Sequence, residues 1–127
     1  MDIFKLFDCG KLIMYDKTVD FSSIEWTNHS SFEGVKLKHI LTSKDTKGSF
    51  SYHLVQIAPN CCIGEHIHNT QIETHEIVGG SGVCYMSDKK IKYEVGTLCV
   101  IPANMKHKVI ANENGLYLFA KFIPALC

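Results

Sequence analysis

Short segments with the residue pattern of β-strands follow one another from residue 35 to the end of the chain. The segment 35–43 (VKLKHILTS) alternates in the way expected of a half-buried strand, and 50–58 (FSYHLVQIA) reads as a second strand. Further strand-like segments are 62–68, 72–78, 82–87, 90–94, 97–102, 107–111 and 116–123. Turn-forming sequences separate them, including 44–48, Gly79–Gly80 and 112–115. Many short strands between such turns predict an all-β sandwich or barrel without a long helix.

The first 34 residues have a different character. Their apolar residues come in short bursts without sustained helical spacing, and residues 22–34 place turn formers around the only tryptophan, Trp26. We therefore expect residues 1–34 to form an N-terminal arm with edge strands. The arm would pack either on the barrel or on a partner subunit. Residues 35–127 would form the barrel itself, and 127 residues suit one domain with a substantial core.

The charge balance argues against nucleic acid and against an anionic membrane as partners. Lys and Arg together number 13, as do Asp and Glu, so the formal charge is zero and no basic surface for nucleic acid is expected. No segment approaches the roughly 20 apolar residues of a membrane span, and the N-terminus lacks a signal-peptide pattern. The six cysteines form no CxxC pair, which is typical of thiols in a reducing compartment. We expect a cytoplasmic protein.

The final segment, LYLFAKFIPALC, is apolar on both faces apart from Lys121. A strand of this kind is buried on both sides, either in the core of the protein or in a subunit interface. This segment and the N-terminal arm together favour a homodimer.

Histidines and a glutamate gather between two of the expected strands. Residues two apart in a strand share a face, so His66 and His68 point the same way. Glu73 can join them from the next strand, after the polar bend at residues 69–71. Two imidazoles and a carboxylate can bind a borderline or hard divalent ion. Solvated polar side chains on a β-surface would give the same local pattern.

These residues also match the first motif of a known family. Through them the chain resembles a small single-domain member of the cupin superfamily. The family motif has two histidines two positions apart, then a glutamate, with a glycine at each end. His66, His68, Glu73 and Gly80 match it, and Asn60 takes the place of the first glycine.

The second cupin motif lies closer to the C-terminus. It is matched by Gly96, Pro102 and His107. Asn104 stands where the family has glycine, and Ala111 stands where it has asparagine. Asparagine is the residue after glycine that best tolerates a positive φ, so the turn at Asn104 should be preserved.

The resemblance implies a fold, a ligand set and a cofactor. The fold would be a jelly-roll barrel, also called a double-stranded β-helix. His66, His68, Glu73 and His107 would hold one divalent transition metal inside it. Three imidazoles and a carboxylate suit Fe, Mn, Ni, Co or Zn and leave coordination positions open. His53 and His75 are candidates for binding a substrate or orienting a ligand, since His75 shares a strand face with Glu73.

Three functions are compatible with this site. The chain could be a metal-dependent enzyme for a small organic molecule, of the dioxygenase, isomerase or decarboxylase type. It could instead be a non-catalytic domain that binds or senses a small molecule. The third function is a structural β-domain that the metal rigidifies. We favour the enzyme, although a fold alone does not determine a function.

Overall fold

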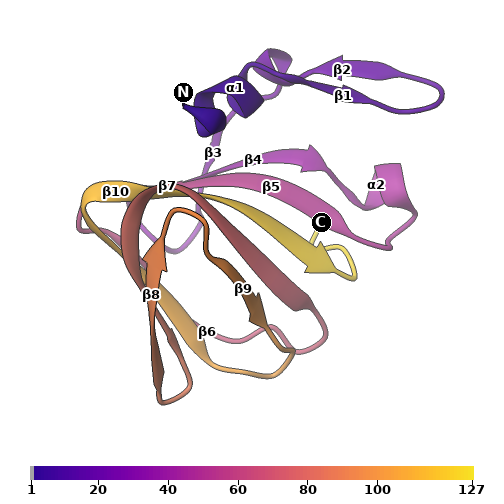
Figure 1. The fold of residues 1–127 in the computed structure, drawn as a ribbon. Coiled ribbons are helices and arrows are strands. Elements are labelled where there is room, and N and C mark those ends of the chain that lie inside the picture. Colours follow the sequence, from indigo (N-terminus) through magenta and orange to yellow (C-terminus); the bar gives the residue numbers. More distant parts are fainter. Residues whose placement is uncertain (1) are drawn as a thin grey trace.

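The computed structural model describes residues 2–127, in which short helices accompany a predominantly β fold (Figure 1). The elements are α1 (Ile3–Asp8), β1 (Lys11–Ile13), β2 (Thr18–Asp20), the 3-10 helix η1 (Phe21–Ser23), β3 (Thr27–Asn28), β4 (Val35–Leu41), α2 (Ser43–Thr46), β5 (Ser51–Ile57), β6 (Cys62–His66), β7 (Ile72–Met86), β8 (Lys89–Glu94), β9 (Leu98–Ile101) and β10 (His107–Ile123). The all-β jelly-roll predicted from the sequence is confirmed.

Two long strands, β7 and β10, connect the two halves of the barrel. The C-terminal half of β10 pairs with β5 and with the first half of β7, which also pairs with β9. The N-terminal half of β10 pairs with β6 and with the second half of β7, which also pairs with β8. All of these pairings are antiparallel. The interior between the two halves is where the candidate site lies.

The turns predicted at Gly79–Gly80 and at residues 112–115 are wrong. At both places the chain continues as one strand, and the register between β7 and β10 shifts there as it does at a β-bulge. Gly80 and Gly115 both have positive φ, and a Cβ on Gly80 would lie 2.0 Å from the Gly115 carbonyl oxygen. The glycines therefore bend two paired strands around the barrel corner together, without reversing the chain.

Two short helices also differ from the sequence expectation. Residues 44–48 were predicted as a turn, but a one-turn helix, α2, begins after a capping box formed by Thr42 and Asp45. The helix α1 has six residues, and the Asp2 carboxylate accepts a hydrogen bond from the Lys5 backbone N–H at its start. Both helices are too short to show helical periodicity in a sequence window.

The first part of the N-terminal arm, up to Trp26, lies on the outer face of the barrel (Figure 1), whereas Phe32 packs against the interior core. Phe4 and Phe21 are buried on the outer face against Ile40, Leu54 and Phe119, which project outward from β4, β5 and β10. The opposite faces of these strands contribute to the interior core, so β10 is buried on both sides, as its sequence predicted. The division of the chain into an arm (1–34) and a barrel (35–127) stays a prediction.

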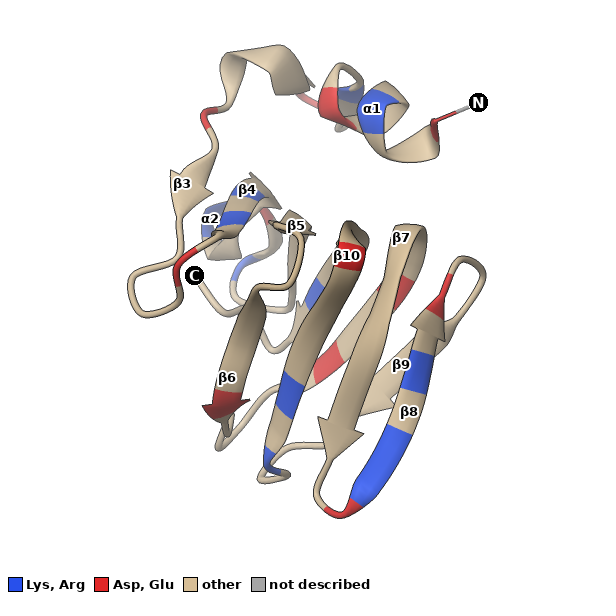
Figure 2. Cartoon of the chain, turned by 90° about the vertical axis from the view of Figure 1, so that its left-hand side faces the viewer, with Lys and Arg blue, Asp and Glu red and all other residues tan. Residues whose placement is uncertain are grey.

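Charged residues are dispersed over the strands. In the view of Figure 2, β10 carries both lysine and acidic segments, β8 carries lysines and β6 carries one acidic residue. Among residues 2–127, no helix has the length and apolar character needed to cross a membrane.

Candidate metal centre

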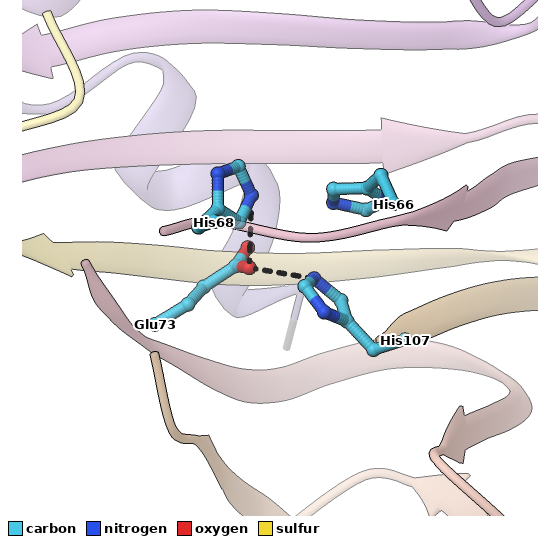
Figure 3. A group of neighbouring side chains, drawn as sticks. All are labelled: His66, His68, Glu73 and His107. Atoms are coloured by element: carbon cyan, nitrogen blue, oxygen red, sulfur yellow. Dashed lines mark hydrogen bonds and ion pairs between the residues drawn. The ribbon is translucent and has the colours of Figure 1, made fainter. Parts of the chain in front are cut away.

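The four side chains expected as metal ligands meet inside the barrel (Figure 3). His66 ends β6 and lies opposite His107, the first residue of β10, in the strand register. Glu73 comes from β7, and His68 lies in the loop between β6 and β7. One donor atom from each of the four residues lies within 4.8 Å of the others. Strand pairing thus brings together two motifs that are far apart in the sequence.

Two asparagines complete the turns that position these ligands. Asn60 and Asn104 both adopt positive φ, as expected at the places where the family has glycine. The Asn104 backbone N–H also donates to the carbonyl of His68 at 2.8 Å. The turn before His107 is therefore tied directly to the loop that carries His68.

Hydrogen bonds to the backbone orient two of the imidazoles. His66 Nδ1 lies 2.7 Å from the Gly64 carbonyl, and His107 Nδ1 lies 2.9 Å from the Met105 carbonyl. A carbonyl can only accept a hydrogen bond, so each Nδ1 carries a proton. For a neutral ring, this leaves the Nε2 lone pair free for a metal, which is the arrangement that bound metals require of their histidine ligands. The donor set therefore fits a divalent transition ion.

Glu73 is buried and contacts three histidine rings. Its carboxylate oxygens lie 2.7 Å from His75 Nε2, 3.1 Å from His107 Nε2 and 3.6 Å from His68 Nε2. Burial alone would raise the pKa of Glu73, but the His75 and His107 rings outweigh it and hold this pKa well below its usual range. Glu73 is therefore an ionised carboxylate in a buried setting.

The imidazole pKa values diverge around this carboxylate. Burial would lower the pKa of His107, but the hydrogen bonds to Glu73 and to the Met105 carbonyl raise it overall. Burial lowers the pKa of His66 and of His68, the two rings that Glu73 supports less strongly. Since His107 faces an acceptor through each ring nitrogen, a proton on its Nε2 takes the place that a metal would occupy.

His75 supports Glu73 from the side away from the other ligands. It is fully buried, and its Nδ1 lies 2.8 Å from the hydroxyl of Tyr93, which is also fully buried. The tyrosine can donate to Nδ1 while Nε2–H donates to Glu73, so the three side chains form one chain of hydrogen bonds. The shared strand face of His75 and Glu73 was predictable from their spacing. The contribution of Tyr93 from β8 was not.

The cavity beside the ligands has a volume of about 80 Å³. His66, His68, Glu73 and His75 line it together with apolar side chains from several strands and from the C-terminal segment, namely Leu37, Val55, Ile63, Leu118, Ala120, Phe122 and Leu126. Of the residues between 2 and 127 that line it, none is Lys or Arg. The cavity is small, apolar and without a cationic side chain of that type.

Of the polar residues that line this cavity, sequence reasoning missed one, and it assigned to the site a histidine that lies elsewhere. His29, which follows β3 in the N-terminal arm, lines the cavity, although nothing in its local sequence indicates this. His53 is fully buried, and its ring nitrogens face His39 and Ser51. Within residues 2–127, the cavity lining includes His75 but not His53. Substrate contact by His53 or by His75 stays a prediction.

Comparison with known proteins bears on the family and on the fold. Residues 53–119, more than half of the chain, match the family described as cupin domain. No curated protein matches the sequence closely enough to be counted as a relative.

Solved structures with the same fold include three of interest. A predicted oxalate decarboxylase from Thermotoga maritima has a TM-score of 0.73 at 22% identity, over 81% of this chain and 95% of that one. KdgF from Halomonas sp. has a TM-score of 0.71 at 16% identity, over 81% and 90% of the two chains. A mutant of Bacillus subtilis oxalate decarboxylase, an enzyme described with Mn(II) centres, has a TM-score of 0.73 at 17% identity, over 84% of this chain and 29% of that one.

At such low identities these likenesses concern the fold alone, whereas the sequence match covers both histidine motifs. The strand order, the positive-φ asparagines and the convergence of His66, His68, Glu73 and His107 agree with that match. The chain therefore belongs to the cupin family.

Proposed function

We propose that this protein is a metal-dependent enzyme that acts on a small organic molecule at an ion held by His66, His68, Glu73 and His107. The observation that carries the proposal is the convergence of four donor atoms within 4.8 Å of one another inside a barrel. Two of the rings are held in the tautomer that metal binding needs. A bound divalent ion would supply Lewis acidity and open coordination positions for a small ligand.

The donor set narrows the choice of metal. Three imidazoles and a carboxylate suit Mn, Fe, Co, Ni or Zn, and none of the four ligands is a thiolate, which would favour softer ions. The Mn(II) centres described for B. subtilis oxalate decarboxylase make manganese the first ion to test. Glu73 would neutralise one charge of a divalent ion, and the three rings would add none.

The cavity limits the size and chemistry of the substrate. A volume of about 80 Å³ is far below the roughly 300–1,000 Å³ of sites for drug-sized ligands. The substrate, or the part of it that reacts, therefore has only a few non-hydrogen atoms. With no lysine or arginine among the described lining residues, a carboxylate on the substrate would be balanced by the ion.

The protein groups available for proton transfer are His29 and His75. His75 is held between Glu73 and Tyr93, so it serves to orient Glu73. His29 accepts a hydrogen bond from the Ser31 backbone N–H through Nδ1 at 3.0 Å, which leaves Nε2–H to donate. Decarboxylation, isomerisation and dioxygenation place different demands on a proton-transferring histidine.

The test begins with elemental analysis of the purified protein and of two ligand variants. We expect the wild type to contain about one divalent transition ion per chain more than His66→Ala or His107→Ala, with the barrel still folded in both variants. The control is Glu76→Gln, on the face of β7 opposite Glu73, which leaves all four ligands intact and should keep the wild-type metal content. Full metal content in both ligand variants would refute the ligand assignment.

Activity is then measured with small carboxylates, oxalate first. Release of carbon dioxide without oxygen consumption would identify a decarboxylase, and oxygen consumption would identify a dioxygenase.

A specific observation also favours a second function, that of a non-catalytic domain that binds a small molecule. The cavity is mostly apolar, and among the described residues that line it the polar ones are histidines and one glutamate. Tight binding of the same probes without turnover would select it.

We also propose that the protein forms a homodimer in the cytoplasm. Exposed apolar side chains on α1 (Ile3, Leu6 and Phe7) and on β9 (Leu98 and Val100) support an interface between copies. All six cysteines are free thiols, which fits a reducing compartment. Light scattering coupled to size exclusion should give twice the mass of one chain. The mass of one chain at micromolar concentration would contradict the dimer.

A further inference from the structure

A second group of metal-ligating side chains lies outside the candidate centre. His39 on β4 and His53 on β5 are direct partners in the strand register, so their side chains lie next to each other. Their Nδ1 atoms are 2.7 Å apart, and the Cys127 Sγ lies 3.8 Å from His39 Nδ1. One donor atom from each of the three residues lies within 4.8 Å of the others. None of these residues belongs to the cupin motifs.

From this geometry we propose that His39, His53 and Cys127 form a second metal site, which binds Zn(II) or another thiophilic transition ion. Two imidazoles and a thiolate are ligands that zinc, copper(I) and cobalt(II) prefer, whereas the candidate centre offers no sulfur. A fourth position would be left for water, as in zinc sites with three protein ligands.

The distances already approach those of a tetrahedral ion. With Zn–N near 2.0–2.1 Å and Zn–S near 2.3 Å, the nitrogen and sulfur of two tetrahedral ligands lie about 3.6 Å apart. The observed separation between His39 Nδ1 and Cys127 Sγ is 3.8 Å. Two nitrogens would lie about 3.3 Å apart, so the rings of His39 and His53 must separate by roughly 0.6 Å. His39 is half-buried and can turn by that amount.

The surroundings are compatible with the tautomer that the site needs. His53 Nε2 lies 2.8 Å from the Ser51 hydroxyl, which also accepts the Leu126 backbone N–H. With Nε2–H donating to Ser51, the Nδ1 lone pair of His53 points toward His39. Burial lowers the pKa of His53 to about 4 and holds that of His39 below its usual value, so both rings are neutral at pH 7. Cys127 is exposed, which gives an ion access to the site.

The C-terminal segment is already held where the site requires it. The carbonyl of Cys127 accepts from the Ser43 N–H at 2.6 Å, and the Ala125 N–H donates to the Gly48 carbonyl at 3.1 Å. Figure 1 shows this end of the chain beside β5 and α2. Leu126, next to Cys127, lines the cavity of the candidate centre. An ion on Cys127 would thus fix the segment that closes one side of that cavity.

Cobalt(II) tests this proposal because only the second site offers a thiolate. Metal-depleted protein titrated with Co(II) should develop the intense near-ultraviolet band of sulfur-to-cobalt charge transfer. We expect Cys127→Ser to abolish the band and His39→Ala to weaken Co(II) binding at least tenfold. Cys9→Ser, which removes another exposed thiol, should retain the band. His66→Ala should retain it too, which separates this proposal from the fate of the candidate centre.

Alkylation of the thiols gives a second measurement. Zn(II) should slow the reaction of Cys127 with iodoacetamide at least tenfold, as followed by peptide mass spectrometry. The exposed Cys62 in the same sample should react at an unchanged rate. The proposal is overturned if no charge-transfer band forms, if the band persists in Cys127→Ser, or if zinc leaves the alkylation of Cys127 unchanged. In that case His39 and His53 simply share a proton between their Nδ1 atoms.

Discussion

The sheet that contains β4, β5, β10 and β7 buries one charged cluster on each of its faces. On the outer face, Lys38 is 3% exposed, and its ammonium lies 2.5 Å from the Asp8 carboxylate and 2.7 Å from the Phe21 carbonyl. On the inner face, the Glu73 carboxylate is surrounded by imidazoles. The outer cluster contains its own cation, and the inner one consists of lone-pair donors around an anion.

The difference separates a structural cluster from a functional one. The protein itself satisfies each Lys38 proton donor with an oxygen of the N-terminal arm, and Trp26 both stacks near the ammonium and donates to Asp8. In the inner cluster, three ring nitrogens and a carboxylate point toward one another. Only a proton or a metal ion between them can offset the repulsion of their lone pairs. Buried charges are common in both roles, so the donor balance is what distinguishes them.

Removal of the outer cation should have the largest effect on stability. Lys38→Ala leaves the Phe21 carbonyl without its donor and leaves the Asp8 carboxylate, 31% exposed at its side chain, without its cation, although the Trp26 Nε1–H still donates to it. We expect the free energy of unfolding to fall by about 4 kcal/mol, with unchanged metal content per folded chain. Urea denaturation measures it, with the exposed Lys36→Ala on the same strand as a control expected within about 0.5 kcal/mol. A decrease in the free energy of unfolding of less than about 1 kcal/mol would contradict a structural role for Lys38.

Acid should lower the free energy of unfolding through the buried ring of His53. The pKa of His53 is about 4 in the folded state, against 6.5 for an unperturbed histidine, chiefly because burial disfavours its charged form. The free energy of unfolding is therefore unaffected by His53 above pH 6.5. It falls by up to about 3 kcal/mol as the pH drops from 6.5 toward 4, because the unfolded state takes up the proton first. Urea denaturation of metal-depleted protein across this range measures the slope. His53→Gln should flatten it, and an equal slope in that variant would contradict the assignment.

Neutralising the inner anion should affect the metal more than the fold. In Glu73→Gln, the amide keeps the shape of the carboxylate but loses its charge, so we expect metal affinity to fall at least 100-fold, about 2.7 kcal/mol. The apo protein should lose only about 1 kcal/mol. The control is Glu76→Gln, on the opposite face of β7, which should bind metal like the wild type. Competition with a chromogenic chelator measures the affinities, and equal affinity in the two variants would mean that Glu73 is not a ligand.

The smallest effect is expected from the hydrogen bond behind Glu73. Tyr93→Phe removes the hydroxyl that lies 2.8 Å from His75 Nδ1 and leaves the ring packed in the core. Since groups that orient ligands typically contribute tenfold or more to affinity, we expect about a tenfold loss of metal affinity. Tyr85→Phe, which changes a half-buried tyrosine in β7, should leave the affinity unchanged. The same chelator competition compares both variants with the wild type.

Local sequence determined most strand positions and the pairwise relations within a strand. Alternation located the individual strands, and the spacing of His66 and His68 and of Glu73 and His75 fixed which side chains share a direction. Asn60 and Asn104 stand where the family has glycine, and because asparagine tolerates a positive φ best after glycine, the positive φ found at both was expected. These features depend only on backbone geometry over a few residues, so they can be inferred without knowing the fold.

Tertiary structure decided what no local pattern encodes. Gly80 and Gly115 bend continuous strands because β7 and β10 are paired there, whereas an isolated glycine-rich sequence reads as a turn. Strand pairing and packing alone bring together side chains from segments far apart in sequence. They place His29 at the cavity, Tyr93 beside His75 and Cys127 beside His39. Sequence thus determined which residues could bind a metal, and long-range pairing determined which of them meet.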